Sequence, residues 1–143
     1  MTDLEPEKLY DRIFVARQPI FTADMQIWGY ELLFRHGENV QAAIFTDGDQ
    51  ATTQVIADGF TLAAQSMRKG ARALINFPRN MLLGEAAYVL SPERCVVEIL
   101  ETVQPEAEVM EACRELKKNG YTLALDDFVG DPGFEPICEI ADI

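Results

Sequence analysis

Short runs of apolar residues alternate with polar turns along this chain, and the first two runs predict a β-hairpin. Residues 13–21 and 27–35 are rich in β-branched, leucine and aromatic side chains, and a polar turn over residues 22–26 separates them. Residues 1–12 contain no such run, and we expect them to form a polar N-terminal arm. The domain itself is predicted to span residues 13–143.

A helix is predicted over the stretch 46–66, because apolar residues recur there at helical spacing. Asp47 or Asp49 is placed to cap its N-terminus. The predicted apolar side of this helix consists of Val55, Ile56, Phe60, Leu62 and Ala63. Gly59 lies inside the same helix, where glycine is about 1 kcal/mol less favourable than alanine, and this indicates close packing at that position.

The second half of the chain alternates short apolar strands with helices. Strands are predicted at residues 72–78, 95–100 and 121–129, and a short helix near residues 81–85. The clearest helix spans residues 105–120, with Pro105 near its start, two lysines in its last turn and Gly120 after it. Its predicted buried stripe consists of Val103, Ala107, Met110, Cys113 and Leu116. A further turn and helix follow over residues 131–143.

This order of elements predicts an α/β fold built on a parallel sheet. The later strands are apolar along nearly their whole length, which is typical of strands buried on both faces beneath helices. An open Rossmann-type sheet and a (β/α)8 barrel both fit the order. Neither GxGxxG nor GxxxxGK[ST] occurs in the sequence, so no nucleotide-binding fingerprint favours the open sheet.

Composition narrows the classes of function. The chain has 143 residues, enough for one domain, and its 24 acidic and 12 basic side chains give a net charge of -12. Such a charge repels phosphate backbones, so we expect no DNA or RNA binding. The N-terminus lacks a secretory signal and the sequence lacks a long apolar run, so we expect no membrane insertion. The three cysteines form no CxxC pair, which favours reduced thiols and a cytoplasmic location.

Oxygen-bearing side chains lie in or just after several predicted strands. They are Glu31, Asn76, Glu98 and the pair Asp126 and Asp127. Taken singly, each has an ordinary explanation, as a solvated strand end or a turn cap. In a βα barrel, however, the carboxyl ends of the strands converge on one mouth. Carboxylates with a carboxamide are hard ligands that suit Mg2+, Mn2+ or Ca2+ better than zinc.

Four motifs in the right order resemble those of the EAL domains, which are phosphodiesterases and receptors of cyclic diguanylate. The motifs are QPIFTADMQIWGYELLFR, LINFP, EILE and LALDDF. In the family the first reads roughly QPI, a hairpin and GYEALLR, so Glu31 begins the name-giving triplet. The resemblance covers the chain from about Val15 to Ile143, and it implies a partial TIM-like (β/α) barrel of the EAL type, with only the N-terminal strands and an initial hairpin.

The resemblance implies a role for each matching residue. The expected ligands of Mg2+ or Mn2+ are Glu31, Asn76, Glu98, Asp126 and Asp127. Gln18 and Arg35 are expected near the dinucleotide, with Arg35 as a charge-assisted donor to a phosphate. Glu101 corresponds to the glutamate that steadies a neighbouring loop. An active member of the family would hydrolyse cyclic diguanylate to the linear product pGpG by metal-assisted attack of water.

The motif variants ELLFR, EILE and DDFV are most similar to those of a subgroup in which a degenerate EAL domain precedes an HDOD domain. Pro78 stands where the family usually has serine, and FVGDPGFEP replaces a loop close to FGxGxxS. These departures favour a binding or scaffold module in bacterial signalling, with an HDOD domain as a partner in the parent protein. The alternative is the N-terminal part of an active cyclic diguanylate phosphodiesterase.

In the family, a strand carrying a catalytic lysine follows directly after a stretch like IADI, which ends this chain at Ile143. We therefore expect a truncated domain that lacks the lysine, the later glutamate and the remaining strands, and that does not turn over. An incomplete barrel would expose a sheet edge and apolar surface, so self-association is expected as well.

Overall fold

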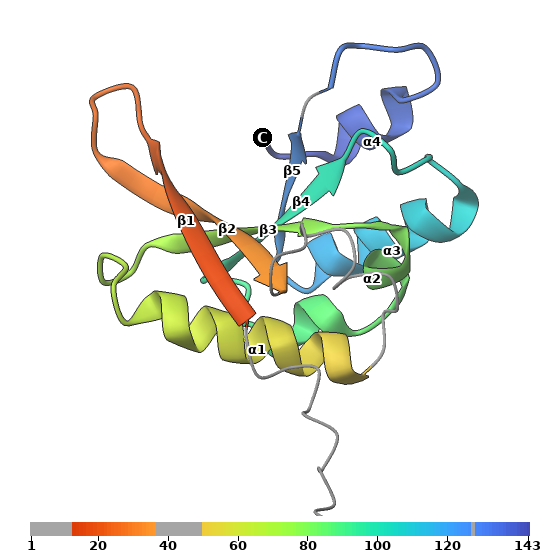
Figure 1. Cartoon of the computed structure of the whole chain (residues 1–143). Coiled ribbons are helices and arrows are strands. Elements are labelled where there is room, and N and C mark those ends of the chain that lie inside the picture. The colour runs from red at the N-terminus through yellow and green to blue at the C-terminus, as the bar shows by residue number, and fades with distance from the viewer. Residues whose placement is uncertain (1–12, 37–49, 127) are drawn as a thin grey trace, which may run out of the picture.

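The computed structural model describes residues 13–36, 50–126 and 128–143, so the predicted arm over residues 1–12 and the caps Asp47 and Asp49 lie outside the described residues. The strands are β1 (Ile13–Phe21), β2 (Ile27–His36), β3 (Arg72–Phe77), β4 (Cys95–Leu100) and β5 (Thr122–Asp126). The helices are α1 (Gln50–Ala64), α2 (Arg79–Leu83), the 3-10 helix η2 (Ala86–Val89), α3 (Ala107–Lys118) and α4 (Glu135–Ile140). Figure 1 shows their arrangement. Every predicted strand is present, although β5 is shorter than predicted and ends at Asp126.

The strands form one sheet in the order β1-β2-β3-β4-β5, so each strand lies beside its neighbour in the sequence. The first pair is the predicted antiparallel hairpin, and all later pairs are parallel. A Rossmann sheet instead reverses its strand order near the middle, because its two halves are wound in opposite directions. The observed order is that of a (β/α) barrel, and it decides between the two folds that the sequence left open.

Helices α1, α2 and α3 cover one face of the sheet (Figure 1). The strand residues that face these helices alternate with those of the other face, as the strand period of two requires. The buried strand residues on the helical side are Tyr30, Leu32, Phe34, Ala73, Ile75, Phe77, Cys95, Val97, Ile99 and Leu123. The opposite face carries a second, smaller cluster of Leu74, Val96 and Ala124, against which Ile20 and Trp28 pack. Both faces of the parallel strands are therefore buried.

Gly59 of α1 lies against β2, as its position in the helix predicts. A Cβ atom at this residue would be 2.2 Å from Cε1 of Phe34 and 3.2 Å from Cγ2 of Val15. Real Cβ atoms do not approach other atoms so closely, and the Phe34 ring is fully buried. The missing side chain is thus what allows α1 to pack directly on the hairpin.

Two predicted apolar stripes are partly wrong. Leu62 is 55% exposed, because the buried residues Ile56 and Ala63 are two turns apart and Leu62 is rotated about 100° from Ala63. In α3 the side chain of Ala107 is exposed and Val109 takes the buried place, together with Met110, Cys113 and Leu116. Val103 is buried as predicted, but it lies before the helix begins.

Within the described ranges, no helix has both the length and the apolar character that crossing a bilayer requires.

Candidate metal centre

Three of the predicted metal ligands come together on the sheet face opposite the helices. Glu31, Glu98 and Asp126 each offer a carboxylate oxygen, and these oxygens all lie within 4.8 Å of one another. They come from β2, β4 and β5, so residues 95 positions apart in the sequence meet at one place. Only the sheet can achieve this, because no local turn spans such a separation.

The strand register explains the convergence. Asn76 pairs with Glu98 across β3 and β4, and Glu98 pairs with Ala124 across β4 and β5. Paired residues of neighbouring strands point to the same face, and so does Asp126, two positions after Ala124. Glu31 lies near the middle of β2 rather than at its end, where it pairs with Leu74. The glutamate side chain, which is one methylene group longer than that of aspartate, nevertheless reaches the same cluster.

Asn76 adds a carboxamide to the three carboxylates. Its Nδ2 donates a long hydrogen bond of 3.5 Å to Oε1 of Glu31. Its Oδ1 is buried and accepts no hydrogen bond from any described residue. A buried acceptor that lacks a donor is costly, by roughly 1–3 kcal/mol, unless a cation or water satisfies it. The donor set around this atom contains oxygens alone, which is the chemistry of a hard divalent cation.

Electrostatics favours a cation in the same place. Glu98 is only 8% exposed, so water screens its charge poorly. Two carboxylates whose oxygens lie within 4.8 Å of each other repel by at least about 3 kcal/mol at an effective dielectric constant of about 20. A divalent cation among the three would replace this repulsion by attraction. The residues present therefore fit the metal that the sequence predicts.

For the predicted site residues Gln18, Arg35 and Asp127, the structure describes the backbone pairing of the first two and does not describe Asp127. Gln18 lies opposite Glu31 across the β1–β2 pair, on the same face of the hairpin. The backbone of Arg35 pairs with Phe14, but its side chain lies outside the described part of the structure. Asp127 also lies outside the described residues. The roles of these three residues stay predictions.

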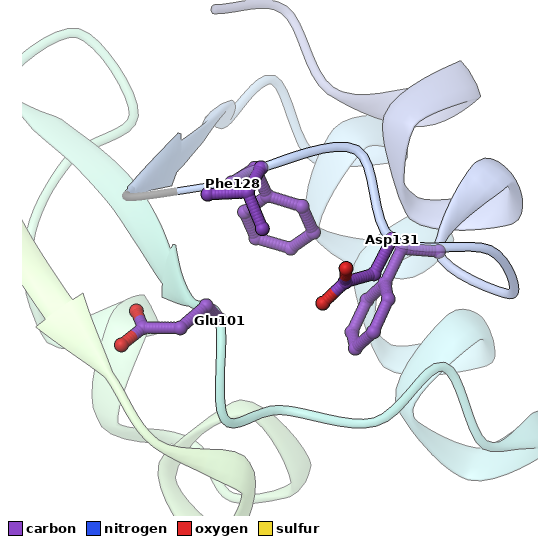
Figure 2. Close-up of a pocket in the computed structure, with 5 residues that line it drawn as sticks. Glu101, Phe128 and Asp131 are labelled. Carbon is purple, nitrogen blue, oxygen red and sulfur yellow. The ribbon is translucent and has the colours of Figure 1, made fainter.

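Glu101 follows β4 and lies beside the altered loop. It lines a small pocket of about 80 Å³ together with Phe128, Val129, Asp131 and Phe134. Figure 2 shows the loop residues on one side of this pocket and Glu101 on the other, with its carboxylate turned away from Asp131. The rings of Phe128 and Phe134 meet edge to face, with their centroids 5.3 Å apart. The loop thus has its own apolar support, and its predicted dependence on Glu101 stays a prediction.

Two sets of long-range ion pairs were not predicted from the sequence. Arg79, at the start of α2, contacts Oε2 of Glu106 at 2.9 Å and Oε2 of Glu108 at 3.0 Å. The hydrogen bond and charge of Glu106 raise the pKa of Arg79 above its ordinary value. Lys117 and Asp142 form the second set, 3.2 Å apart. Both pairs join residues 25 or more positions apart, and no local pattern signals such contacts.

No model of a known protein family matches the chain. Individual proteins do match it. The chain is 45% identical, over 123 residues, to the Vibrio cholerae protein named cyclic di-GMP phosphodiesterase CdgJ, a match that covers 85% of this chain and 28% of that protein. It is 42% identical, over 119 residues, to the uncharacterized protein YuxH of Bacillus subtilis, covering 82% of this chain and 29% of that protein. The chain therefore spans less than a third of the length of these relatives.

Solved structures show the same fold at lower sequence identity. The Bacillus subtilis protein YkuI, which has an EAL domain and was solved with cyclic diguanylate and calcium, superposes with a TM-score of 0.64 at 20% identity, covering 92% of this chain and 40% of its own. Klebsiella pneumoniae BlrP1, solved with manganese and cyclic diguanylate, gives 0.65 at 18% identity, covering 96% of this chain and 39% of its own. With the sheet order and the sequence identity to CdgJ, these likenesses show that the chain belongs to the EAL-domain family and comprises part of an EAL domain.

Proposed function

We propose that this chain is a metal-dependent binding module for cyclic diguanylate in a bacterial signalling protein, and that it does not hydrolyse the nucleotide. The observation that carries the proposal is the cluster of Glu31, Glu98 and Asp126, whose carboxylate oxygens lie within 4.8 Å of one another beside Asn76. The complexes of YkuI and BlrP1 with cyclic diguanylate and a divalent metal support the choice of ligand.

Each residue of the cluster has a defined task in this proposal. Glu31, Glu98 and Asp126 supply negative oxygens to one divalent cation, Mg2+ or Mn2+, and Oδ1 of Asn76 supplies a neutral one. When bound, the cation attracts and polarises a phosphoryl oxygen of the dinucleotide. Gln18 and Arg35 contact the nucleotide, and Asp127 would hold a second cation. With a net charge of -12, the chain needs a bound cation or a local arginine to attract a phosphate ligand.

The altered loop supports binding without hydrolysis. FVGDPGFEP keeps Phe128 but places Val129, Asp131 and Phe134 where active members of the family carry two glycines and a serine. The edge-to-face contact of Phe128 with Phe134 fixes this loop through apolar packing. Glu101, whose carboxylate is turned away from Asp131, has no serine or threonine partner in this loop. Those features favour a degenerate site that retains its metal ligands.

The alternative is part of an active phosphodiesterase that yields pGpG. It is favoured by the presence of every metal-ligand residue type at its motif position, and by the name of the V. cholerae relative, cyclic di-GMP phosphodiesterase. Turnover is the property that separates the two proposals, since both require the same metal centre.

Calorimetric titration with Mn2+ and then with cyclic diguanylate tests the proposed function. Glu98→Gln keeps the size of the side chain and removes one charge, and we expect it to weaken Mn2+ binding about 10-fold to 100-fold, because a charged oxygen ligand is replaced by a neutral one. Glu93→Gln is the matched control, because it makes the same change at an exposed residue just before β4 and outside the cluster, and it should bind like the wild type.

Equal Mn2+ affinity in wild type and Glu98→Gln would overturn the metal centre. Heat from cyclic diguanylate only after Mn2+ has been added would support the binding module. The absence of heat with about 100 μM nucleotide would favour a scaffold, since weaker affinities correspond to less than about 6 kcal/mol. Formation of pGpG during the same incubation would favour the phosphodiesterase.

The wider context belongs to the same proposal. We propose that residues 13–143 act as one EAL-type unit after a polar arm, next to an HDOD domain in the parent protein, and that this unit self-associates. A cytoplasmic location is supported by Cys95, Cys113 and Cys138, which are all free thiols. Light scattering of the chain at several concentrations tests the self-association.

A further inference from the structure

Residues 142 and 143 lie along the edge of β5 that β4 does not occupy. The amide of Asp142 donates to the carbonyl of Leu123 at 2.8 Å, and the amide of Ile143 donates to the same carbonyl at 3.2 Å. In return, the amide of Leu125 donates to the carbonyl of Ile143 at 3.0 Å. These backbone bonds continue the sheet up to Leu125, the residue directly before the metal-cluster residue Asp126.

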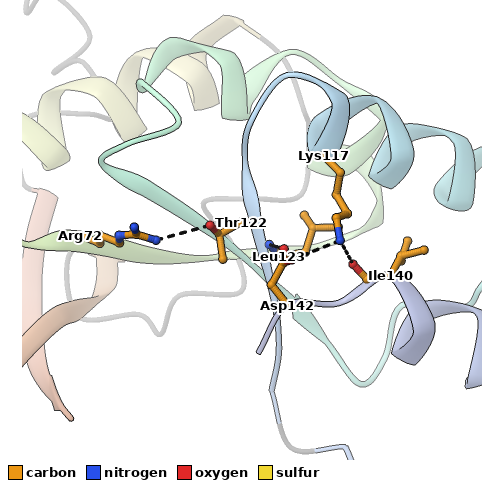
Figure 3. Close-up of polar contacts among 6 residues, drawn as sticks. All are labelled: Arg72, Lys117, Thr122, Leu123, Ile140 and Asp142. Carbon is orange, nitrogen blue, oxygen red and sulfur yellow. Dashed lines mark hydrogen bonds and ion pairs between the residues drawn. The ribbon is translucent and has the colours of Figure 1, made fainter.

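Lys117 and Asp142 hold this segment in place, and we call these two side chains the latch (Figure 3). Nζ of Lys117 donates to the carbonyl of Ile140 at 2.7 Å and to Oδ1 of Asp142 at 3.2 Å. The other carboxylate oxygen, Oδ2, accepts the amide of Leu123 at 2.9 Å. One carboxylate therefore ties the last turn of α3 to the backbone of β5.

The latch is better suited to local order than to global stability. The two side chains are 36% and 39% exposed, and an ion pair of that kind contributes only about 0–1 kcal/mol. The bond from the Leu123 amide to a charged acceptor is stronger, because charge-assisted hydrogen bonds are roughly twice as strong as neutral ones. Loss of the latch should accordingly loosen the free edge of β5 while the core, which lies on the helical face, remains packed.

We propose that Lys117 and Asp142 are positioning residues that order the end of β5 and thereby hold Asp126 at the metal cluster. The metal part of this inference rests on the proposed function. Asp126 pairs with Leu100 of β4 on one side, and on the other side the segment that the latch holds is bonded to Leu125, the residue directly before Asp126. A metal site requires each ligand to lie within about 0.5 Å of its productive place, so a frayed strand end weakens binding.

The experiment compares amide hydrogen exchange and Mn2+ affinity in variants of the whole chain. In Asp142→Ala we expect exchange at Leu123 and Leu125 to become at least about fivefold faster, and Mn2+ binding to weaken about threefold to tenfold, because the strand end frays. Lys117→Met should show a smaller change in the same direction. Asp142→Asn keeps an oxygen that can accept the Leu123 amide, and it should recover much of the lost affinity.

Lys118→Met and Glu139→Ala are the matched controls. Each removes the same kind of charge from the same region, yet neither residue takes part in the latch contacts, and both variants should behave like the wild type. The melting temperature, measured alongside, separates the local effect from general unfolding.

The outcomes distinguish the two proposals. Unchanged exchange at Leu125 in Asp142→Ala would overturn the inference, and so would faster exchange with unchanged Mn2+ affinity, because Asp126 would then not depend on the latch. A wild-type chain that binds no Mn2+ would instead contradict the proposed function. In that case exchange alone decides whether the latch orders β5.

Discussion

At the scale of single residues, Glu98 and Asn76 are polar side chains whose burial lowers the stability of the fold. Glu98 is almost fully buried beside two other carboxylates, and Oδ1 of Asn76 is buried and accepts no hydrogen bond from the described residues. Aliphatic side chains at these positions would remove both costs. Residues that oppose stability in this way are typical of functional sites, which is why this cluster supports a metal centre.

Gly59 provides a prediction at the same scale. Gly59→Ala should lower the free energy of unfolding by about 2 kcal/mol, because the clash with the buried Phe34 ring outweighs the gain of about 1 kcal/mol in helix propensity. Urea denaturation followed by circular dichroism measures the change. Leu62→Ala, in the same helix, should stay within about 0.5 kcal/mol of the wild type, since Leu62 is exposed. A stabilised Gly59→Ala variant would contradict the close packing.

At the scale of elements, each helix is held by the stripe that it presents to the sheet. The stripe of α3 consists of Val109, Met110, Cys113 and Leu116, and the same helix ends at Lys117 and Lys118, near the C-terminal segment. α3 therefore has two tasks, because one side of it covers the core and its last turn holds the latch. Arg79 joins the start of α2 to the start of α3 through ion pairs that are largely exposed and contribute only about 0–1 kcal/mol each.

Val109 tests the orientation of α3. Val109→Ala should lower the free energy of unfolding by about 2 kcal/mol, because two buried methyl groups are lost and a cavity remains. Ala107→Ser, two residues away on the exposed side, should change it by less than about 0.5 kcal/mol. Thermal or urea denaturation measures both variants. Equal effects at the two positions would mean that the helix is rotated relative to this structure.

At the scale of the whole molecule, burial divides the cysteines into two classes. Burial raises the pKa of Cys95 to about 12 and that of Cys113 to about 11, whereas Cys138 is exposed on α4. Alkylating reagents react with thiolates and not with thiols. Cys95 and Cys113 are therefore protected in two ways, because reagents cannot reach the buried thiols and because these thiols stay protonated. The reactivity of the thiols thus reports on the integrity of the core.

Mass spectrometry after iodoacetamide treatment at pH 8 should show one modified cysteine, Cys138, in the folded protein and three in urea. Folding also raises the pKa of Cys95 from an ordinary value of 9 to about 12, so the folded state retains a proton that the unfolded state loses. Its contribution to stability is present below pH 9 and is lost as the pH rises toward 12. Rapid alkylation of Cys95 in the folded protein would contradict its burial.

Local sequence patterns were enough to predict the secondary-structure elements and the candidate metal ligands of this protein. Short apolar runs between polar turns located the strands, and apolar residues at helical spacing located the main helices, because both patterns are local properties of the chain. The oxygen-bearing residues Glu31, Asn76, Glu98 and Asp126 stood out because apolar strands rarely carry them, and their motifs indicated the EAL family. Those inferences needed only neighbours in the sequence.

Tertiary structure alone decided how these parts meet. It placed the strands in barrel order, turned Leu62 and Ala107 outward, and brought three carboxylates within 4.8 Å of one another. It also joined Lys117 to Asp142, a contact between residues 25 positions apart. Helix rotation and sheet register depend on the packing of many distant side chains at once, and no local pattern in the sequence encodes the sum of those contacts.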